Sequence, residues 1–503
     1  MTQPPTKKQK VSGKRDPLIL NFFQALTPVL HAPGQWKNPR DESRKYYTAE
    51  NWIKTAKIAE RGKIHGIFFG DSLAPYGGYN SKDLDGPFNF QEAAKSGNNF
   101  PKNDPTAYLA AMAINTKNLS FGFTCTTLSE HPYHFARRMA TLDHISKGRV
   151  GWNVVTSFLE SAARNLLNNE RLPAKPERYE KADEYLQVFY ELLLSSWRDD
   201  GVVFDREHGI FSNPDAIREI NFEGKYFKVP GPQISEPSPQ RIPLIIQAGT
   251  SEKGALLGAK HSELIFLGGE SPEIVAEKIA NIRKLATEKY NRDIKKLKFV
   301  TIARIIVGKT SEEAQAKWKE IESYKDVEGI MVQVGGRGID LSLVDSWDED
   351  LTKSPHESIR LAALGVSKGN PGVKITKKFF VDSHFTTFIG SAEEVADEIE
   401  HYVEVSGIDG FNFTNVVFPE NFEDIVDLLI PELQKRGLAQ TEYAVEGGTY
   451  REQIYREKGH TFVPEDHYAY GLRWKAGVSK EDFEEHLKEL KKKQEELKIY
   501  AYK

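Results

Sequence analysis

The chain repeats one pattern eight times: a short apolar run with the length of a buried strand, then a run with apolar residues at helical spacing. Eight strand–helix units of this kind predict an α/β fold, a closed (β/α)8 TIM barrel. Functional residues of such barrels follow the carboxyl ends of the strands, so the residues there become our site candidates. The eight predicted strands cover residues 18–23, 66–69, 119–124, 149–155, 243–247, 263–267, 299–307 and 410–414.

Segments outside this repeat divide the chain. Residues 1–16 are polar and basic, which is typical of a disordered tail. The barrel is predicted over residues 17–437, with insertions near 198–240 and 325–376 and a small hairpin over 220–229 in the first of them. Residues 438–503 predict a C-terminal helical extension that ends in a charge-dense helix.

Composition excludes several classes of protein. The single cysteine, Cys125, excludes an intramolecular disulfide framework and favours a reducing, cytoplasmic location. A formal net charge of −4 gives no reason to expect a nucleic-acid partner, and no apolar run is long enough to span a membrane. His131 and His134 have the spacing of metal ligands, but without an acidic or cysteine partner they predict no metal site.

Polar side chains follow three neighbouring strands of the predicted barrel. Asp71 comes directly after the second strand, Cys125 and Thr126 end the third, and Asn153 lies near the end of the fourth. This set of mostly neutral donors and acceptors suits a flat polar heterocycle better than acid–base hydrolysis. A purely structural role, as a turn former or cap, is an equally good interpretation for Asp71.

A second set of residues predicts a phosphate site. Thr250 and Ser251 follow the fifth strand and lead into a helix, whose N-terminus offers free N–H groups and the positive end of its dipole. Plain N-capping would use the same residues. Arg178 and Tyr179 open another helix and could contact the same phosphate, and Lys175 lies one turn before Tyr179 on the same helix face. No dinucleotide glycine fingerprint and no P-loop occur, so bound NAD or ATP is not predicted.

His31, after the first strand, is a candidate proton donor.

Several motifs together resemble one family. They are residues 20–23 (LNFF), 68–71 (FFGD), 141–144 (TLDH), 148–157 (GRVGWNVVTS), 247–251 (QAGTS) and 407–412 (GIDGFN). The chain resembles the bacterial-luciferase-like flavin monooxygenases over roughly residues 18–437. The similar branch contains the nitrilotriacetate, EDTA, long-chain alkane and dibenzothiophene-sulfone monooxygenases.

The resemblance implies a TIM barrel that binds reduced FMN, supplied by a separate NAD(P)H:flavin reductase. Reduced FMN and O2 would form a flavin peroxide that oxygenates a small organic substrate. Carried over by motif, Asp71 would contact the isoalloxazine ring, Cys125 or Thr126 and also Asn153 would line the flavin, and Tyr179, Thr250 and Ser251 would hold the phosphate. Lys175 stands where the branch usually has histidine. We also expect a homodimer or homotetramer.

Two alternatives remain at this point. The same fold could serve a deazaflavin-dependent oxidoreductase, although the strand ending in residues 152–156 (WNVVT) argues against it. A non-catalytic flavin-binding protein is the other alternative, and only the lysine at position 175 supports it. The identity of the substrate does not follow from the sequence.

Overall fold

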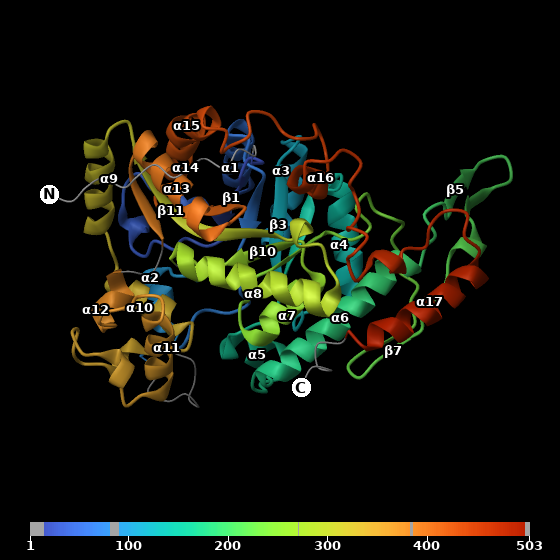
Figure 1. Cartoon of the computed structure of the whole chain (residues 1–503), viewed down its shortest axis with the longest axis horizontal. Coiled ribbons are helices and arrows are strands. Elements are labelled where there is room, and N and C mark those ends of the chain that lie inside the picture. Colours follow the sequence, from blue (N-terminus) through green and yellow to red (C-terminus); the bar gives the residue numbers. More distant parts are fainter. Residues whose placement is uncertain (1–14, 81–89, 270, 383–385, 498–503) are drawn as a thin grey trace.

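Parallel strands closed into a barrel form the centre of the molecule, a computed structural model that describes residues 15–80, 90–269, 271–382 and 386–497 (Figure 1). Hydrogen bonding between β10 and β11 closes the ring, so the predicted TIM barrel is confirmed. Within the described residues, the eight strands of the ring are β1 (Ile19–Gln24), β2 (Gly66–Phe69), β3 (Ser120–Thr126), β4 (Val150–Val155), β9 (Leu244–Gln247), β10 (Leu264–Leu267), β11 (Lys298–Gly308) and β13 (Gly410–Thr414).

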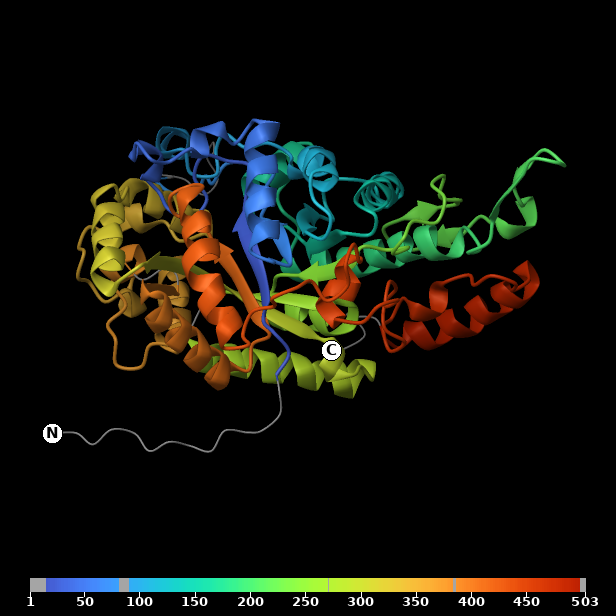
Figure 2. The same cartoon turned by 90° about the horizontal axis from the view of Figure 1, so that it is seen from above.

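Helices surround the ring, as Figures 1 and 2 show. Their starts and stops follow from local sequence: α4 has Pro132 at its first position and ends where Lys147 and Gly148 take positive φ angles of 56° and 84°. The main core lies between strands and helices. The covering helices are α1 (Ala49–Arg61), α3 (Leu109–Ile114), α4 (Pro132–Ser146), α6 (Lys175–Ser195), α7 (Glu252–His261), α8 (Pro272–Tyr290), α9 (Ser311–Ser323), α13 (Ala392–Ser406), α14 (Glu420–Asp424) and α15 (Ile430–Lys435).

One strand of the central sheet was not predicted. β12 (Thr387–Ser391) pairs in parallel with residues 304–308 of β11. It can do so because β11 is 11 residues long and continues past its partners in the barrel, β10 and β13. The barrel therefore carries one extra strand outside its closed ring, which is an exception to the eightfold repeat.

The two insertions have different structures. In the first, β5 (Val202–Asp205) and β6 (Ile210–Ser212) form one hairpin, and β7 (Phe222–Glu223) with β8 (Lys228–Val229) forms the predicted one. Together with α17 (Lys480–Glu495) this region projects from the barrel as an arm (Figure 2). The second insertion is helical, with a separate apolar cluster around Met331, Leu351 and Ile359. Its helices are α10 (Val327–Gly335), α11 (Glu357–Ser367) and α12 (Lys377–Asp382).

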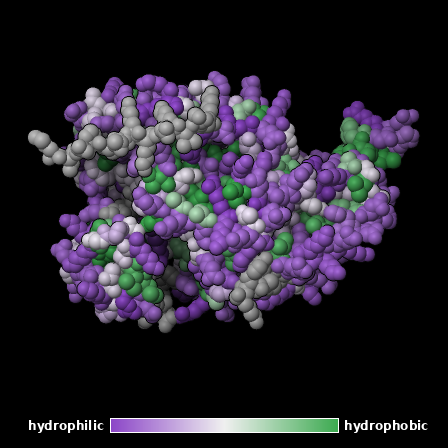
Figure 3. Space-filling model, in the orientation of Figure 1, coloured by the Kyte–Doolittle hydropathy of each residue, from purple (hydrophilic) through white to green (hydrophobic). Residues whose placement is uncertain are grey.

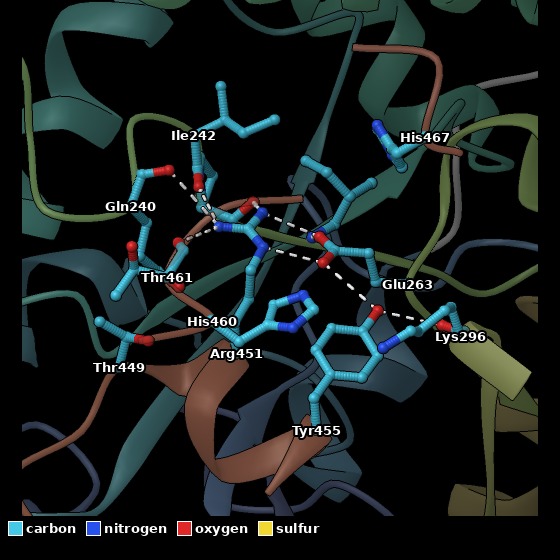
Figure 4. A network of polar contacts seen from close by, with 12 residues as sticks. Gln240, Ile242, Glu263, Lys296, Thr449, Arg451, Tyr455, His460, Thr461 and His467 are labelled. Carbon is cyan, nitrogen blue, oxygen red and sulfur yellow. Dashed lines mark hydrogen bonds and ion pairs between the residues drawn. The ribbon is translucent and has the colours of Figure 1, made fainter. Parts of the chain in front are cut away.

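The C-terminal extension closes the amino end of the barrel. Tyr450 and Ile454 of α16 (Tyr450–Tyr455) pack with the apolar side chains inside the ring. Arg451, fully buried between them, pairs with the equally buried Glu263 (Figure 4): Nε and Nη2 of the arginine each lie 2.8 Å from a carboxylate oxygen. The extension is therefore part of the barrel's interior and not only an external helix.

At the chain ends, residues 1–14 of the predicted disordered tail and residues 498–503 of the extension lie outside the described residues. No helix in the described parts of the chain is both long enough and apolar enough to cross a membrane.

Candidate functional site

A cavity of about 940 Å³ opens at the carboxyl ends of β2, β3, β4 and β9. Its wall is built mainly from five segments, four of which lie at or just after strand ends, while residues 99–104 belong to the loop before α3; Arg138 of α4 and Leu257 of α7 also line it. The five segments are residues 71–75, 99–104, 124–130, 154–159 and 247–251, and the start of α6 completes the wall. The cavity is thus at the end of the barrel where the sequence places the candidate residues.

Seven of the nine predicted site residues line this one cavity: Asp71, Cys125, Thr126, Lys175, Tyr179, Thr250 and Ser251. Asn153 does not. It is buried below the cavity wall, where its Nδ2 donates to Thr124 Oγ1 at 2.9 Å. His31 lines a separate small hollow, and its Nδ1 lies 2.8 Å from Thr414 Oγ1 at the end of β13. The structure therefore brings most of the predicted set together and places these two residues elsewhere.

One end of the cavity is formed by the N-termini of α6 and α7. Ser251 is the N-cap of α7, and its hydroxyl accepts from the backbone N–H of Gly254 at 3.3 Å. A Cβ added at Gly249 would lie 3.3 Å from the hydroxyl of Tyr179 and only 2.5 Å from the terminal amide of Gln247. Glycine therefore allows the α6 tyrosine to approach the start of α7 closely.

Arg178 adds a cation to this end of the cavity. Its Nη1 donates to the backbone carbonyl of Ser157, while its Nε is buried and has no partner among the described residues. Burial lowers the pKa of the guanidinium. Lys175, at the first position of α6, is exposed. A buried donor left unpaired costs free energy, so this end of the cavity is prepared for an acceptor that the protein does not itself supply.

The opposite end of the cavity contains Asp71. Burial raises the pKa of its carboxyl group to about 6, although Lys102, with Nζ 3.9 Å from Asp71 Oδ1, opposes this shift. Lys102 lines the cavity but was not predicted as a site residue, because it lies in a long loop without periodicity. Burial lowers the pKa of Lys102 to about 8. Burial also raises the pKa of the Cys125 thiol to about 12, so Cys125 is not a nucleophile at neutral pH.

Contrary to the prediction that they lack an acidic partner, one of the two spaced histidines has a carboxylate beside it. This acidic neighbour is Glu130, whose carboxylate lies 2.9 Å from His134 Nδ1. His131 instead caps α4. Among the described residues, no group of three or more histidine, cysteine or acidic side chains could hold a metal ion.

Comparison with known proteins identifies the family. The family model for luciferase-like monooxygenases matches residues 35–409. The long-chain alkane monooxygenase of Geobacillus thermodenitrificans is 41% identical over 452 residues, which are 90% of this chain and 96% of that protein. Component A of the nitrilotriacetate monooxygenase of Aminobacter aminovorans is 30% identical over 452 residues, 88% of this chain and 97% of that one.

A solved structure agrees with these relatives. The crystal structure of a riboflavin lyase with modified FMN and riboflavin superposes with a TM-score of 0.80 at 29% identity, covering 91% of this chain and 100% of that one. The chain belongs to the luciferase-like monooxygenase family. The predicted family and reaction class are confirmed: it is a flavin-dependent monooxygenase, an oxidoreductase that incorporates oxygen into its substrate.

Proposed function

We propose that this chain is the oxygenase component of a two-component monooxygenase. It binds reduced FMN made by a separate NAD(P)H:flavin reductase, takes O2 as co-substrate, and inserts one oxygen atom into a small organic molecule. The names of two relatives support this proposal, because one is a component of a divided enzyme and another was solved with a modified FMN.

The observation that carries the proposal is the unpaired Nε of Arg178 at the helix-terminal end of the cavity. A phosphate monoester is an acceptor of the right kind for this donor, the hydroxyls of Thr250 and Ser251, and the dipole of α7. Lys175 and Tyr179 line the same end. FMN carries its phosphate at one end and a flat ring with N–H and carbonyl groups at the other, and Asp71 and Thr126 line the second end of the cavity.

Bound reduced flavin supplies the two electrons with which one atom of O2 enters the substrate and the other leaves as water. The protein's own contribution is to bind, orient and exclude water. Between its two polar ends the cavity has an apolar wall that includes Ala74, Phe100 and Leu159, and Leu73 and Phe158 lie partly exposed at its rim. Such a wall keeps solvent away from reactive species and offers contacts to apolar parts of a substrate.

We also propose a homodimer or homotetramer in the cytoplasm. The arm supports self-association, because Phe204 and Phe211 of the β5–β6 hairpin are 55% and 63% exposed. Figure 3 shows hydrophobic residues gathered on this arm. Exposed apolar patches of this kind commonly mark protein contacts.

The single cysteine, which forms no disulfide, supports the proposed cytoplasmic location.

The test compares FMN with riboflavin, which lacks the phosphate. Arg178→Met should weaken FMN binding by about 10- to 100-fold, the range of a charge-assisted hydrogen bond, and should change riboflavin binding little. Arg44→Met, at an exposed arginine outside the cavity, is the matched control. Incorporation of 18O from O2, with a flavin reductase and a substrate panel, tests the reaction. Equal loss of FMN and riboflavin would contradict the phosphate site, and failure of the wild-type protein to bind either flavin would contradict the function.

A further inference from the structure

Lys102 is a buried cation in the wall of the cavity, and no motif assigns it a role. Its side chain is 9% exposed, and its Nζ donates to Asn99 Oδ1 at 2.8 Å and to Ser72 Oγ at 3.0 Å. The third neighbour is the Asp71 carboxylate at 3.9 Å. Both charges of this pair line the cavity.

The backbone holds Lys102 in place from both sides. The N–H of Asn99 donates to the carbonyl of Val29 at 2.9 Å, and the N–H of Asn103 donates to the carbonyl of Leu26 at 2.9 Å. The loop that carries the lysine is thereby fixed to the segment after β1. The ammonium group is therefore a fixed feature of the wall and not the end of a freely moving side chain.

Two other charged groups face Asp71, namely Asp104 and Arg138. Arg138 pairs with Glu130 and lies 3.7 Å from Asp104, so its charge is shared with two other carboxylates. Within the described residues, Asp71 is the carboxylate that pairs with Lys102. Removal of Lys102 would leave Asp71 buried without its nearest cation, and a buried carboxylate in that position takes up a proton.

We propose that Lys102 is a positioning residue that keeps Asp71 ionised, so that the carboxylate accepts a hydrogen bond from an imide N–H of the flavin ring. The inference rests on the proposed function, because it takes the ring to lie at the Asp71 end of the cavity. A protonated Asp71 would offer an O–H donor and a weaker acceptor in place of two acceptor oxygens. Lys102 acts through Asp71 and does not itself contact the flavin.

Riboflavin is the probe for this test, since it has no phosphate whose own titration would obscure that of Asp71. Fluorescence titrations between pH 5 and 9 should show that the wild-type protein loses affinity as Asp71 is protonated near pH 6. Lys102→Met should raise the pH midpoint of this loss of affinity by about one unit or more. At pH 6.5 the affinity of the variant for riboflavin should then be about threefold or more below that of the wild type. The two curves should converge near pH 9.

Three further variants make the result specific. Lys102→Arg should keep the wild-type midpoint, because it restores the cation, and Asp71→Asn should abolish the transition. Lys175→Met, a matched loss of a lysine at the other end of the cavity, should weaken FMN and leave the riboflavin midpoint unchanged. If Lys102→Met does not fold, as judged by circular dichroism, Lys102→Gln replaces it.

The outcomes separate the two hypotheses. An unchanged midpoint in both neutral Lys102 variants would overturn the inference, as would riboflavin binding by the wild-type protein that does not depend on pH. Either result leaves the proposed function standing if FMN still binds through its phosphate. A wild-type protein that binds neither FMN nor riboflavin would instead contradict the proposed function.

Discussion

Two arginines, one at each end of the barrel, differ in how their buried N–H groups are satisfied. At the amino end, all three nitrogens of Arg451 have partners: Glu263 receives two bonds of 2.8 Å, and the carbonyls of Ile242 and Pro243 each receive one of 2.8 Å. At the carboxyl end, the Nε of Arg178 has no partner among the described residues. The protein itself satisfies Arg451, whereas Arg178 keeps a buried Nε–H group that a ligand can use.

We infer from this difference that stability and flavin binding depend on residues at different ends of the barrel. Residues at the amino end should matter for folding and little for flavin, whereas residues at the carboxyl end should show the reverse. Each prediction below compares the two ends, and the expected effects decrease from the first to the last.

Arg451→Met should have the largest effect on folding. The substitution leaves the Glu263 carboxylate buried without its cation, so the free energy of unfolding should fall by about 3–5 kcal/mol in urea titrations. Adding Glu263→Gln removes the uncompensated charge and should recover part of the loss. Protein that remains folded should bind FMN normally. A large drop in FMN affinity would break the comparison, because it would couple the two ends.

Asp71→Asn should change how stability depends on pH. Burial raises the pKa of Asp71 from its ordinary 3.8 to about 6, so the folded state favours the protonated form. The contribution that Asp71 makes to the free energy of unfolding through this shift is complete below about pH 4 and is lost as pH rises through 6. The flavin-free variant should therefore be more stable at pH 7.5, by at most about 3 kcal/mol. Urea titrations at several pH values measure this difference. An unchanged slope between pH 4 and 6 would show that Asp71 does not titrate there.

Arg178→Met should separate binding from stability. The substitution removes the hydrogen bond from Nη1 to the Ser157 carbonyl, at a side chain that is only partly buried, so the free energy of unfolding should fall by no more than about 1 kcal/mol. FMN binding should weaken by about 1.5–3 kcal/mol in calorimetry. Early thermal unfolding together with normal FMN affinity would mean that Arg178 is structural, like Arg451.

The smallest expected effects belong to two substitutions at helix caps, which form a closely matched pair. Ser251 caps α7 at the cavity, and Thr449 caps α16 in a capping box at the amino end. Each change to alanine should cost about 1 kcal/mol of stability in thermal melts. Only Ser251→Ala should also weaken FMN binding. Weaker FMN binding in Thr449→Ala would contradict the division between the two ends.

Much of the fold could be predicted because local signals and tertiary structure agree. The predicted bounds of β2, residues 66–69, match the structure, where a short apolar run forms the strand. The candidate site was predictable to the extent that residues after strands meet on one face. Asn153 does not reach that face, because it lies inside β4, opposite Thr124 of β3, and hydrogen-bonds to that residue below the cavity wall.

Other features depend on contacts that no local pattern reveals. Lys102 reaches Asp71 only because its loop is hydrogen-bonded to Leu26 and Val29, which are far away in the sequence. His31 contacts Thr414, which is 383 residues further along the chain. β12 exists because β11 is long enough to take another partner. In each case the deciding interaction is long-range.

The closure of the barrel by α16 has a consequence for biosynthesis. The last strand of the ring ends at Thr414, but the cation that Glu263 requires is Arg451, 37 residues further along the chain. A nascent chain can therefore expose all eight strands outside the ribosome and still lack the counterion and the apolar side chains that complete its interior. We expect the native barrel to form only after α16 has also left the ribosome, so that this helix acts as a checkpoint for release of the barrel from chaperones.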